Sequence, residues 1–420
     1  MKMAKMKLRL VSCLLVLSAL ATNLVSCALK ISAQDLMEGI NPRGVEGRAP
    51  GEEFYLHSAE LAINLFKKTT DENKNSLISP LSVVLALAMT ANGADTGTLE
   101  QMQAYLGGNI PLSEFNEYLY YYYTNLPSAE KSKLGIANSI WFRDDENRLT
   151  VNKEFLQTNA DYYKASIYKS DFGEKTLEDI NKWVSDKTDG MIDKILDEID
   201  EDTVMYLINA LVFDARWQRV YNKNDIYDGR FTDISGQEQT VDFMFSEESL
   251  YLDDGRATGF IKPYEGSSYS FVALLPNEDV PINEYINSLT GEGFVNTVKS
   301  AENTLVNASL PKFSYDSTVK MNDALKELGI PKAFSANQAD FSNLGKSSRG
   351  NIYIGEVLHK TFISVDELGT RAGAVTKVEM KDEAYFEAKI VKLDRPFVYA
   401  IIDNASGLPV FIGAVMSIEG

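Results

Sequence analysis

The segment between residues 362 and 395 limits what this chain can fold into more than any other part of the sequence. Phe362–Asp366 has the composition of a strand, and Leu393 leads into a second predicted strand, so about two dozen residues lie between them. Connections longer than about 12–15 residues without structure of their own are uncommon, and they are usually functional or disordered. The fold must therefore have a use for a long connection near its C-terminus.

Alternate positions in the first half of this connection differ in character. One set is small or apolar and the other is mostly charged: the first set is Thr370, Ala372, Ala374, Thr376, Val378 and Met380, and the second is Arg371, Gly373, Val375, Lys377, Glu379 and Lys381. A period of two is typical of a strand with one face toward a core and one toward water. We therefore predict a segment that is extended and exposed in one state and a buried sheet strand in another.

The coarse pattern of the chain predicts a mixed α+β fold, with helices dominant early and mostly antiparallel strands later. Leu81–Ala91 is a predicted buried helix that begins at Pro80, because proline suits a first helical turn. Asp179–Leu196 predicts a helix, a break at glycine and a second short helix. Three segments predict strands, the first too apolar for a sheet edge and the last two joined as a hairpin: Val204–Phe213, Phe397–Asp403 and Val410–Val415.

Short motifs along the chain resemble, in their order, the serpin family of protease inhibitors. The hinge of the family's reactive loop resembles Asp366-Glu367-Leu368-Gly369-Thr370 followed by Ala372, Gly373 and Ala374. The other matching segments begin at Asn75 (NSLISPLS), Leu207 (LINA, leading to Trp217), Leu310 (LPKF), Asp340 (DFS) and Asp394 (DRPF). The resemblance covers about residues 52–420 and implies three β-sheets, eight or nine helices and an exposed reactive-centre loop.

The resemblance also implies a function, which is suicide-substrate inhibition of serine endopeptidases, with cysteine endopeptidases as a second class. A target endopeptidase would cut the loop and be held in a covalent complex, while the hinge inserts into the central sheet. The residue roles that follow are a hinge (Glu367, Gly369, Thr370, Ala372, Gly373, Ala374, Val375, Thr376), a polar shutter (Ser79, Ser82, Asn209, His359) and a breach (Trp217, Lys312, Glu367).

The reactive bond has two predicted positions that depend on the direction of counting. Counting forward from Glu367 gives Glu383-Ala384, which we favour because insertion length is constrained from the hinge side. Counting back from Pro396 gives Tyr385-Phe386. The first bond suits glutamate-specific enzymes, the second chymotrypsin-like enzymes, and a bond between Ala384 and Tyr385 an elastase-like enzyme.

The N-terminus resembles a bacterial lipoprotein signal. Basic residues precede an apolar run that is shorter than the ~20 residues of a spanning helix, and Leu24-Val25-Ser26-Cys27 follows as a cleavage site. We expect a signal peptide over 1–26, a lipidated Cys27 that attaches the protein to a membrane of the cell envelope, a flexible tether over 27–51 and the folded domain over 52–420. Secretion after cleavage nearby is the alternative.

Composition excludes several other functions. With 60 acidic and 41 basic residues the net charge is −19, which disfavours nucleic acid, and residues 101–130 contain no Lys or Arg for glycosaminoglycan activation. Only two histidines and two cysteines occur, so we expect no metal or other cofactor and no catalytic enzyme. His57 is expected in an exposed first helical turn, and His359 in the core with a hydrogen-bond partner.

The remaining rival is a non-inhibitory serpin that acts as a carrier or chaperone. Such proteins carry bulky, charged or proline residues at inward hinge positions, and this hinge has none. We expect a monomeric inhibitor.

Overall fold

The computed structural model describes residues 31–128, 132–370 and 388–418, and the compact unit that carries the fold begins at Ala33. It combines three sheets with helices, as expected for an α+β fold of this type. The helices are α2 (Glu52–Thr69), α3 (Pro80–Ala91), α4 (Thr96–Gly107), α5 (Leu112–Thr124), α6 (Lys153–Tyr163), α7 (Glu174–Lys187), α8 (Ile282–Ser288), α9 (Gly291–Lys299) and α10 (Asn322–Glu327), with 3-10 turns at Asp145–Asn147, Lys223–Asp225 and Pro331–Phe334.

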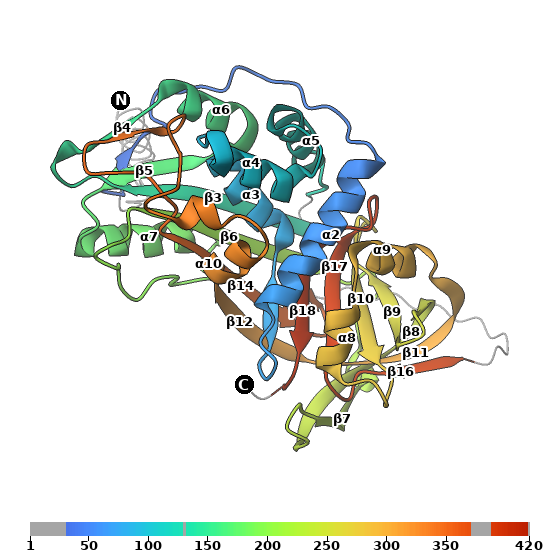
Figure 1. The fold of residues 1–420 in the computed structure, drawn as a ribbon. Helices are drawn as coiled ribbons and strands as arrows, with labels where there is room; N and C mark the ends of the chain where they lie inside the picture. The colour runs from blue at the N-terminus through green and yellow to red at the C-terminus, as the bar shows by residue number, and fades with distance from the viewer. Residues whose placement is uncertain (1–30, 129–131, 371–387, 419–420) are drawn as a thin grey trace, which may run out of the picture. The chain divides into compact units, whose positions relative to one another are not determined.

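A seven-stranded sheet forms one half of the molecule, labelled β3, β5, β6, β12 and β14 in Figure 1. Its strands in spatial order are β1 (Gln34–Asp35), β5 (Ser166–Ser170), β3 (Ser132–Arg143), β6 (Met205–Arg216), β15 (Gly369–Thr370), β14 (Glu356–Val365) and β12 (Phe313–Lys320). The prediction of a central strand at Val204–Phe213 is confirmed, since β6 is buried along nearly its whole length between two neighbours.

A nine-stranded sheet forms the other half. Its strands are β16 (Lys389–Lys392), β11 (Glu302–Pro311), β8 (Glu238–Asp253), β9 (Ala257–Pro263), β10 (Tyr269–Pro276), β17 (Phe397–Asp403), β18 (Pro409–Val415) and β2 (Ser76–Ile78), with β7 (Ile226–Thr232) on β8. The predicted hairpin is confirmed, because β17 and β18 pair as antiparallel neighbours. The third sheet has two strands, β4 (Leu149–Val151) and β13 (Gly345–Ser347).

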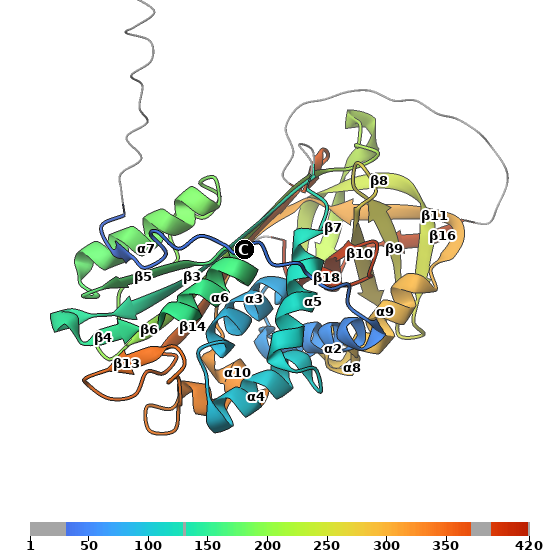
Figure 2. The same ribbon diagram turned by 90° about the horizontal axis from the view of Figure 1, so that it is seen from above.

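Helix α3 packs beneath the seven-stranded sheet, and α7 lies on the opposite face (Figure 2). All twelve residues of α3 are buried, and it begins at Pro80 after the N-cap Ser79, as predicted. Proline at the first position costs no helical hydrogen bond, because that amide would have no partner within the helix. The burial of α3 fixes the polar residues of its first turn against the back of the sheet.

The second short helix predicted within Asp179–Leu196 is wrong. After α7 the chain is non-helical from residue 188 to 204. The Asn181 side chain accepts hydrogen bonds from the backbone amides of Ile195 and Leu196, at 2.8 and 3.0 Å, and donates to the carbonyl of Leu196. A side chain therefore satisfies backbone groups that a helix would have paired internally.

The predicted tether requires a correction for its described part, because residues 33–51 lie along the body. β1 pairs with β5, and the Asp161 carboxylate accepts a 2.7 Å hydrogen bond from the amide of Arg43. Arg48 forms an ion pair with Glu114 at 2.7 Å. These contacts are backbone bonds and ion pairs to distant residues, so they leave no apolar period in the sequence. We call residues 33–51 the N-terminal strap.

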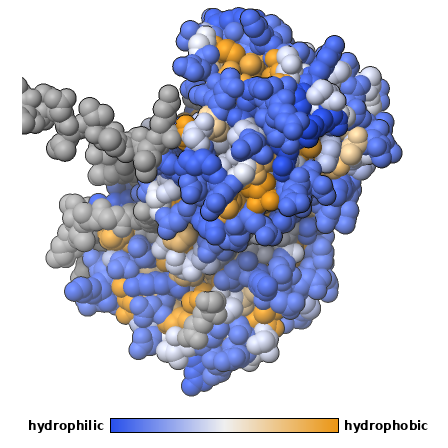
Figure 3. Space-filling view, turned by 90° about the vertical axis from the view of Figure 1, so that its left-hand side faces the viewer, coloured by the Kyte–Doolittle hydropathy of each residue, from blue (hydrophilic) through white to orange (hydrophobic). Residues whose placement is uncertain are grey.

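The surface seen in Figure 3, on the side that carries α7 and β5, is mostly hydrophilic with several small hydrophobic areas. Within the described residues, no helix has both the length and the apolar character needed to cross a bilayer. The predicted signal segment and Cys27 lie outside the described residues.

Candidate functional site: the parted strands of the seven-stranded sheet

Strands β6 and β14 are paired along one part of their length and separated along another. They form a parallel ladder from Tyr206 and Glu356 to Leu211 and Thr361. Beyond that point the two strands diverge, and β15 lies between them, antiparallel to both. The sheet is thus open at one end, and two residues of the connection after β14 already occupy the opening.

A tight turn brings β15 back against β14. The Asp366 carboxylate accepts hydrogen bonds from the amides of Leu368 and Gly369, at 2.8 and 3.2 Å, and its own amide donates to the Gly369 carbonyl. Glycine is required at this position because a Cβ atom would lie 2.1 Å from the carbonyl oxygen of Ala215 on β6. The Asp366 turn and the absence of a side chain at Gly369 together let the chain fit between the strands.

Thr370, the first residue of the predicted inward set, is buried. Its hydroxyl lies 2.6 Å from the hydroxyl of Tyr264, which is itself fully buried and stacks on Trp217. The described start of the hinge therefore has the inward orientation that the alternation predicts. The remaining hinge residues, from Ala372 to Thr376, lie outside the described residues, as do Glu383, Ala384, Tyr385 and Phe386 of the predicted reactive bond.

The four predicted shutter residues come together where β6 and β14 are still paired. Asn209 and His359 are opposite each other in register. The amide of Ser79 donates to Nε2 of His359 at 2.9 Å, and Nδ1 of His359 contacts Oδ1 of Asn209. The amide of Ser82 donates to Oγ of Ser79 at 3.4 Å. The first turn of α3 is thus connected by hydrogen bonds to both strands.

These bonds define the state of the histidine. Because Nε2 of His359 accepts a hydrogen bond from a backbone amide, the proton of the neutral ring resides on Nδ1 and is donated to Asn209. Complete burial lowers the pKa of His359 to about 3. His359 is therefore a neutral core residue with partners on both ring nitrogens, as the sequence predicts.

Asn138 on β3 completes this network and was not among the predicted residues. The Nδ2 group of Asn209 donates to Oδ1 of Asn138 and to the carbonyl of Ser82. Polar residues at one level of three adjacent strands, where apolar residues would be expected, are the sequence signal that could have identified it. The network spans β3, β6 and β14, so separating β6 from β14 requires breaking the contact between Asn209 and His359.

The predicted breach residues meet at the open end of the sheet. Lys312 and Glu367 form an ion pair at 3.0 Å, and Lys312 also lies 3.4 Å from Asp242. The indole nitrogen of Trp217 donates to the carbonyl of Asp366 at 2.8 Å, and its amide donates to the carbonyl of Leu368 at 2.9 Å. The turn before β15 is therefore held from both sides.

A buried ion pair behind the breach was missed by sequence reasoning. Nζ of Lys262 lies 2.7 Å from Oε1 of Glu248, and the two side chains are only 1% and 8% exposed. Burial opposes the positive charge, but Tyr221 and Glu248 raise the pKa of Lys262 above its usual value. The cation also lies 4.3 Å from the centroid of the Tyr221 ring. We call Lys262, Glu248 and Tyr221 the buried lysine cluster.

The buried lysine cluster is linked to the hinge through Tyr221, whose amide donates to the carbonyl of Glu367 at 3.0 Å. A sequence signal existed for it. Lys262 alternates with Phe260 and Tyr264, both fully buried, so it occupies an inward position of the strand, where a cation needs a partner. The partner could not be identified from the sequence, because it lies on another strand.

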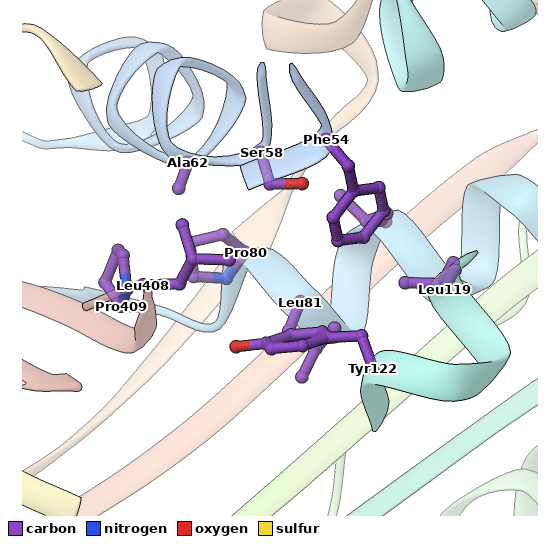
Figure 4. Close-up of a pocket in the computed structure, with 10 residues that line it drawn as sticks. Phe54, Ser58, Ala62, Pro80, Leu81, Leu119, Tyr122, Leu408 and Pro409 are labelled. Atoms are coloured by element: carbon purple, nitrogen blue, oxygen red, sulfur yellow. The ribbon is translucent and has the colours of Figure 1, made fainter. Parts of the chain in front are cut away.

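A small, mostly apolar pocket of about 30 Å³, partly open to solvent, lies away from this site, between α2, α3, α5 and the start of β18 (Figure 4). Its lining includes Phe54, Tyr122 and Pro409, together with Pro80 and Leu81 of α3. Ser58 and Tyr122 supply the hydroxyl groups visible in the close-up. The pocket borders the helix that carries the shutter serines, but it contains none of the predicted site residues.

Comparison with known proteins places these features in a family context. A family model described as "Serpin (serine protease inhibitor)" matches residues 56–418. Human neuroserpin is 28% identical over 383 residues, which is 86% of this chain and 91% of neuroserpin. A serpin-like protein of Thermococcus kodakarensis is 30% identical over 364 residues, covering 84% of this chain and 83% of the relative.

Solved serpin structures are also similar to this chain. The thermophilic serpin tengpin in its native state is 55% identical with a TM-score of 0.89, over 92% of this chain and 99% of that one. Tengpin in its latent state has a TM-score of 0.80, over 89% of this chain and 100% of that one. A thyroxine-binding globulin solved with thyroxine, 23% identical with a TM-score of 0.78 over 88% of this chain and 100% of that one, shares the fold.

Proposed function

Because the chain belongs to the serpin family of protease inhibitors, we propose that it inhibits serine endopeptidases as a suicide substrate, with cysteine endopeptidases as a second class of target. The proposal is that a protease attacks the connection between β15 and β16, and that the cut connection then enters the seven-stranded sheet. The observation that carries it is the position of Gly369 and Thr370, which already pair with β6 and β14 at the open end.

The register of β15 indicates where the rest of the hinge would lie after insertion. Gly369 is opposite Arg216 on β6, and Thr370 is opposite Val365 on β14. Continued along the sequence, this register brings Thr376 between Asn209 and His359. The parallel contact between β6 and β14 would be replaced by two antiparallel contacts, and antiparallel pairing is slightly more stable per residue.

The same register supports the predicted side-chain pattern. The positions on the side of Thr370 would face the core beneath the sheet, and in this chain all of them are small or apolar, from Ala372 to Met380. Met380 would reach Met205, the first residue of β6. Since the sheet ends there, a reactive bond after residue 380 fits the length of the available strand, in agreement with the predicted range.

The proposed reaction is an acyl transfer that stops halfway. The nucleophilic oxygen of a serine protease, or the sulfur of a cysteine protease, bonds to the carbonyl carbon of Glu383, the amide bond to Ala384 breaks, and the nitrogen of Ala384 takes up a proton as it leaves. Tyr385-Phe386 and Ala384-Tyr385 remain alternative bonds. Fifteen residues, Gly369 to Glu383, span about 50 Å as a strand, and moving the acylated enzyme that far would distort the oxyanion site that deacylation needs.

We further propose that the shutter and the breach control this insertion. The contact between Asn209 and His359 has to break before Thr376 can take its place. The pair of Lys312 and Glu367 holds the turn from which insertion starts. The signal peptide over 1–26, lipidation at Cys27 and attachment to the cell envelope also remain proposals, as does a monomeric state.

The rival proposal is a carrier that uses the same fold without inhibition, as thyroxine-binding globulin shares the fold. A carrier does not need small residues throughout the inward hinge positions. The hinge of this chain has no proline and no bulky or charged residue at those positions, which favours inhibition.

A protease panel tests the proposal directly. The chain from Cys27 onward is mixed with elastase, chymotrypsin, trypsin, subtilisin, a glutamyl endopeptidase and papain, followed by denaturing gels and mass spectrometry. A denaturant-stable complex with cleavage between 381 and 386 is the expected result. Cleavage by every active enzyme without any complex would contradict inhibition and favour the carrier.

Two matched variants separate trapping from simple cleavage. Ala374→Arg puts a large cation at a predicted inward position, so we expect cleavage to continue while the complex is lost. Val375→Arg puts the same side chain at the neighbouring outward position, so the complex should persist. Equal behaviour of the two variants would count against strand insertion as the trapping step.

A further inference from the structure

The outer face of the strands near β16 carries exposed hydrophobic side chains. Tyr227 on β7 is 39% exposed, Phe245 on β8 is 38% exposed and Ile390 on β16 is 76% exposed. Among the described residues only two other large hydrophobic side chains are classed as exposed, Leu56 on α2 and Tyr121 on α5. Three of the five therefore lie on one part of one sheet.

The sheet register places these three side chains on the same face. Phe245 is opposite Ser309 on β11, and Ser309 is opposite Lys392 on β16, two residues after Ile390. Residues opposite one another point to the same side, as do residues two apart on one strand. Tyr227 joins this face because its hydroxyl lies 3.0 Å from that of Ser309. We call Tyr227, Phe245 and Ile390 the apolar sheet face.

Protection of the sheet edge does not explain why the Ile390 side chain is exposed. β16 is the outermost strand, and edge strands avoid unwanted pairing by carrying charges, which Lys389 and Lys392 supply on either side of Ile390. An exposed isoleucine between them increases the risk of association instead of lowering it. Large hydrophobic side chains that gather on one exposed face of a folded protein are a typical sign of an interaction surface.

The chain itself limits what can cover this face. Ile390 follows Glu383 by seven residues and Phe386 by four, so it lies at most about 24 Å from the earlier of the two predicted bonds. A protease domain of ordinary size is about 40 Å across. A protease that holds one of these bonds in its cleft can therefore reach the beginning of β16, on the side that receives the residues after the cut.

We propose that the apolar sheet face is a second docking surface for the target protease, one that accepts an apolar patch beside the substrate cleft of the enzyme. This inference rests on the proposed function, because it requires a protease that attacks the connection before β16. It adds a determinant of target choice outside the reactive bond. Docking precedes cleavage, so it changes how fast the protease attacks and does not change the fraction of attacks that end in a complex.

The test compares two double variants of the chain from Cys27 onward. Ile390→Ser with Phe245→Ser removes two members of the apolar sheet face, while Leu56→Ser with Tyr121→Ser removes two exposed hydrophobic side chains of the helices, which are 43% and 37% exposed. The readout is the second-order rate at which a protease consumes the intact chain, whether the product is a complex or a cleaved chain. A synthetic peptide of residues 376–388, which lacks the face, measures attack on the bond alone.

We expect the face variant to be consumed roughly tenfold more slowly than the parent chain, because two partly exposed side chains no longer become buried against the enzyme. The helix variant should match the parent, and the peptide should be attacked slowly. Equal rates for the face variant and the parent, with unchanged unfolding curves, would overturn the inference. The ratio of complex to cleaved chain reports separately on the proposed function.

The alternative occupant of the apolar sheet face is a second copy of this chain. Light scattering at the assay concentration tests this alternative, because it measures the oligomeric state. A parent chain that is monomeric at that concentration agrees with the inference. A parent dimer that the face variant dissociates and the helix variant does not would overturn it, because the face would then belong to a contact between copies.

Discussion

Asn209 and His359 are opposite each other on β6 and β14, and Nδ1 of His359 is hydrogen-bonded to the amide oxygen of Asn209. This contact crosses the line along which the sheet would have to part. It is made by a neutral imidazole, because burial lowers the pKa of His359 to about 3. The protonation state of His359 is therefore linked to the pairing of β6 with β14 in the central sheet.

Mild acid should weaken the fold through His359. Between pH 6.5 and 3 the unfolded chain binds a proton at this residue and the folded chain does not, so the free energy of unfolding falls as the pH falls, by about 1 kcal/mol per pH unit. Urea unfolding at several pH values measures the slope. His359→Gln should flatten it. The matched control is His57→Gln, which removes the only other histidine, and a similar flattening there would contradict the assignment.

The buried lysine cluster should be costly to break from one side. Lys262→Met leaves the carboxylate of Glu248 buried without its cation, and we expect a loss of roughly 3–5 kcal/mol in the free energy of unfolding. Changing Glu248→Leu together with Lys262→Met should restore most of it, because no charge is then left alone. Lys175→Met, in an exposed pair with Glu178, is the control and should leave the unfolding curve in place. If Lys262→Met left the free energy of unfolding unchanged, the buried carboxylate of Glu248 would not need the cation of Lys262.

Gly369→Ala should push β15 out of the opening. A Cβ atom would lie 2.1 Å from the carbonyl oxygen of Ala215, so the strand has to move away from β6. The hydrogen bond from the amide of Trp217 to Leu368 would weaken, and hydrogen exchange at that amide should become roughly tenfold faster.

Gly51→Ala is the matched glycine, since a Cβ atom there meets nothing within 4 Å. It should leave exchange at Trp217 unchanged. If Gly369→Ala behaved in the same way, the close packing of β15 against β6 would not limit the hinge.

The N-terminal strap should contribute to stability. A chain that begins at Gly51 loses β1 and the packing of Leu36, Met37 and Ile40 against the core, for which we expect at least about 2 kcal/mol. It also leaves the nearly buried Asp161 without the amide of Arg43. Denaturant unfolding of chains beginning at Ala28 and at Gly51 measures the difference. Coincident curves would mean that the segment is a tether after all.

The elements that sequence alone predicted well are those with a local signal. The apolar run of β6, the proline at the start of α3 and the turn between β17 and β18 each specify structure within a dozen residues. The partners of His359 came from the family resemblance, because hydrogen bonds between residues 280 positions apart leave no local pattern.

The elements that were missed or wrong depend on distant contacts. The N-terminal strap is held by partners such as Asp161, 118 positions from Arg43, and its own sequence carries only turn signals. The expected helix after Gly190 is displaced by side-chain bonds from Asn181 to a backbone 14 and 15 residues later. The pairing of Lys262 with Glu248 depends on strand register, which the sequence does not specify.

The partial separation of β6 from β14 has a consequence for the amount of this protein that a cell must make. Under the proposed function, completing β15 exchanges one parallel ladder for two antiparallel ones, and nothing in that exchange regenerates the starting arrangement. Each molecule would then be consumed by the first protease it meets. The cell that makes this protein would have to match production to the amount of enzyme it faces, one chain for each protease removed.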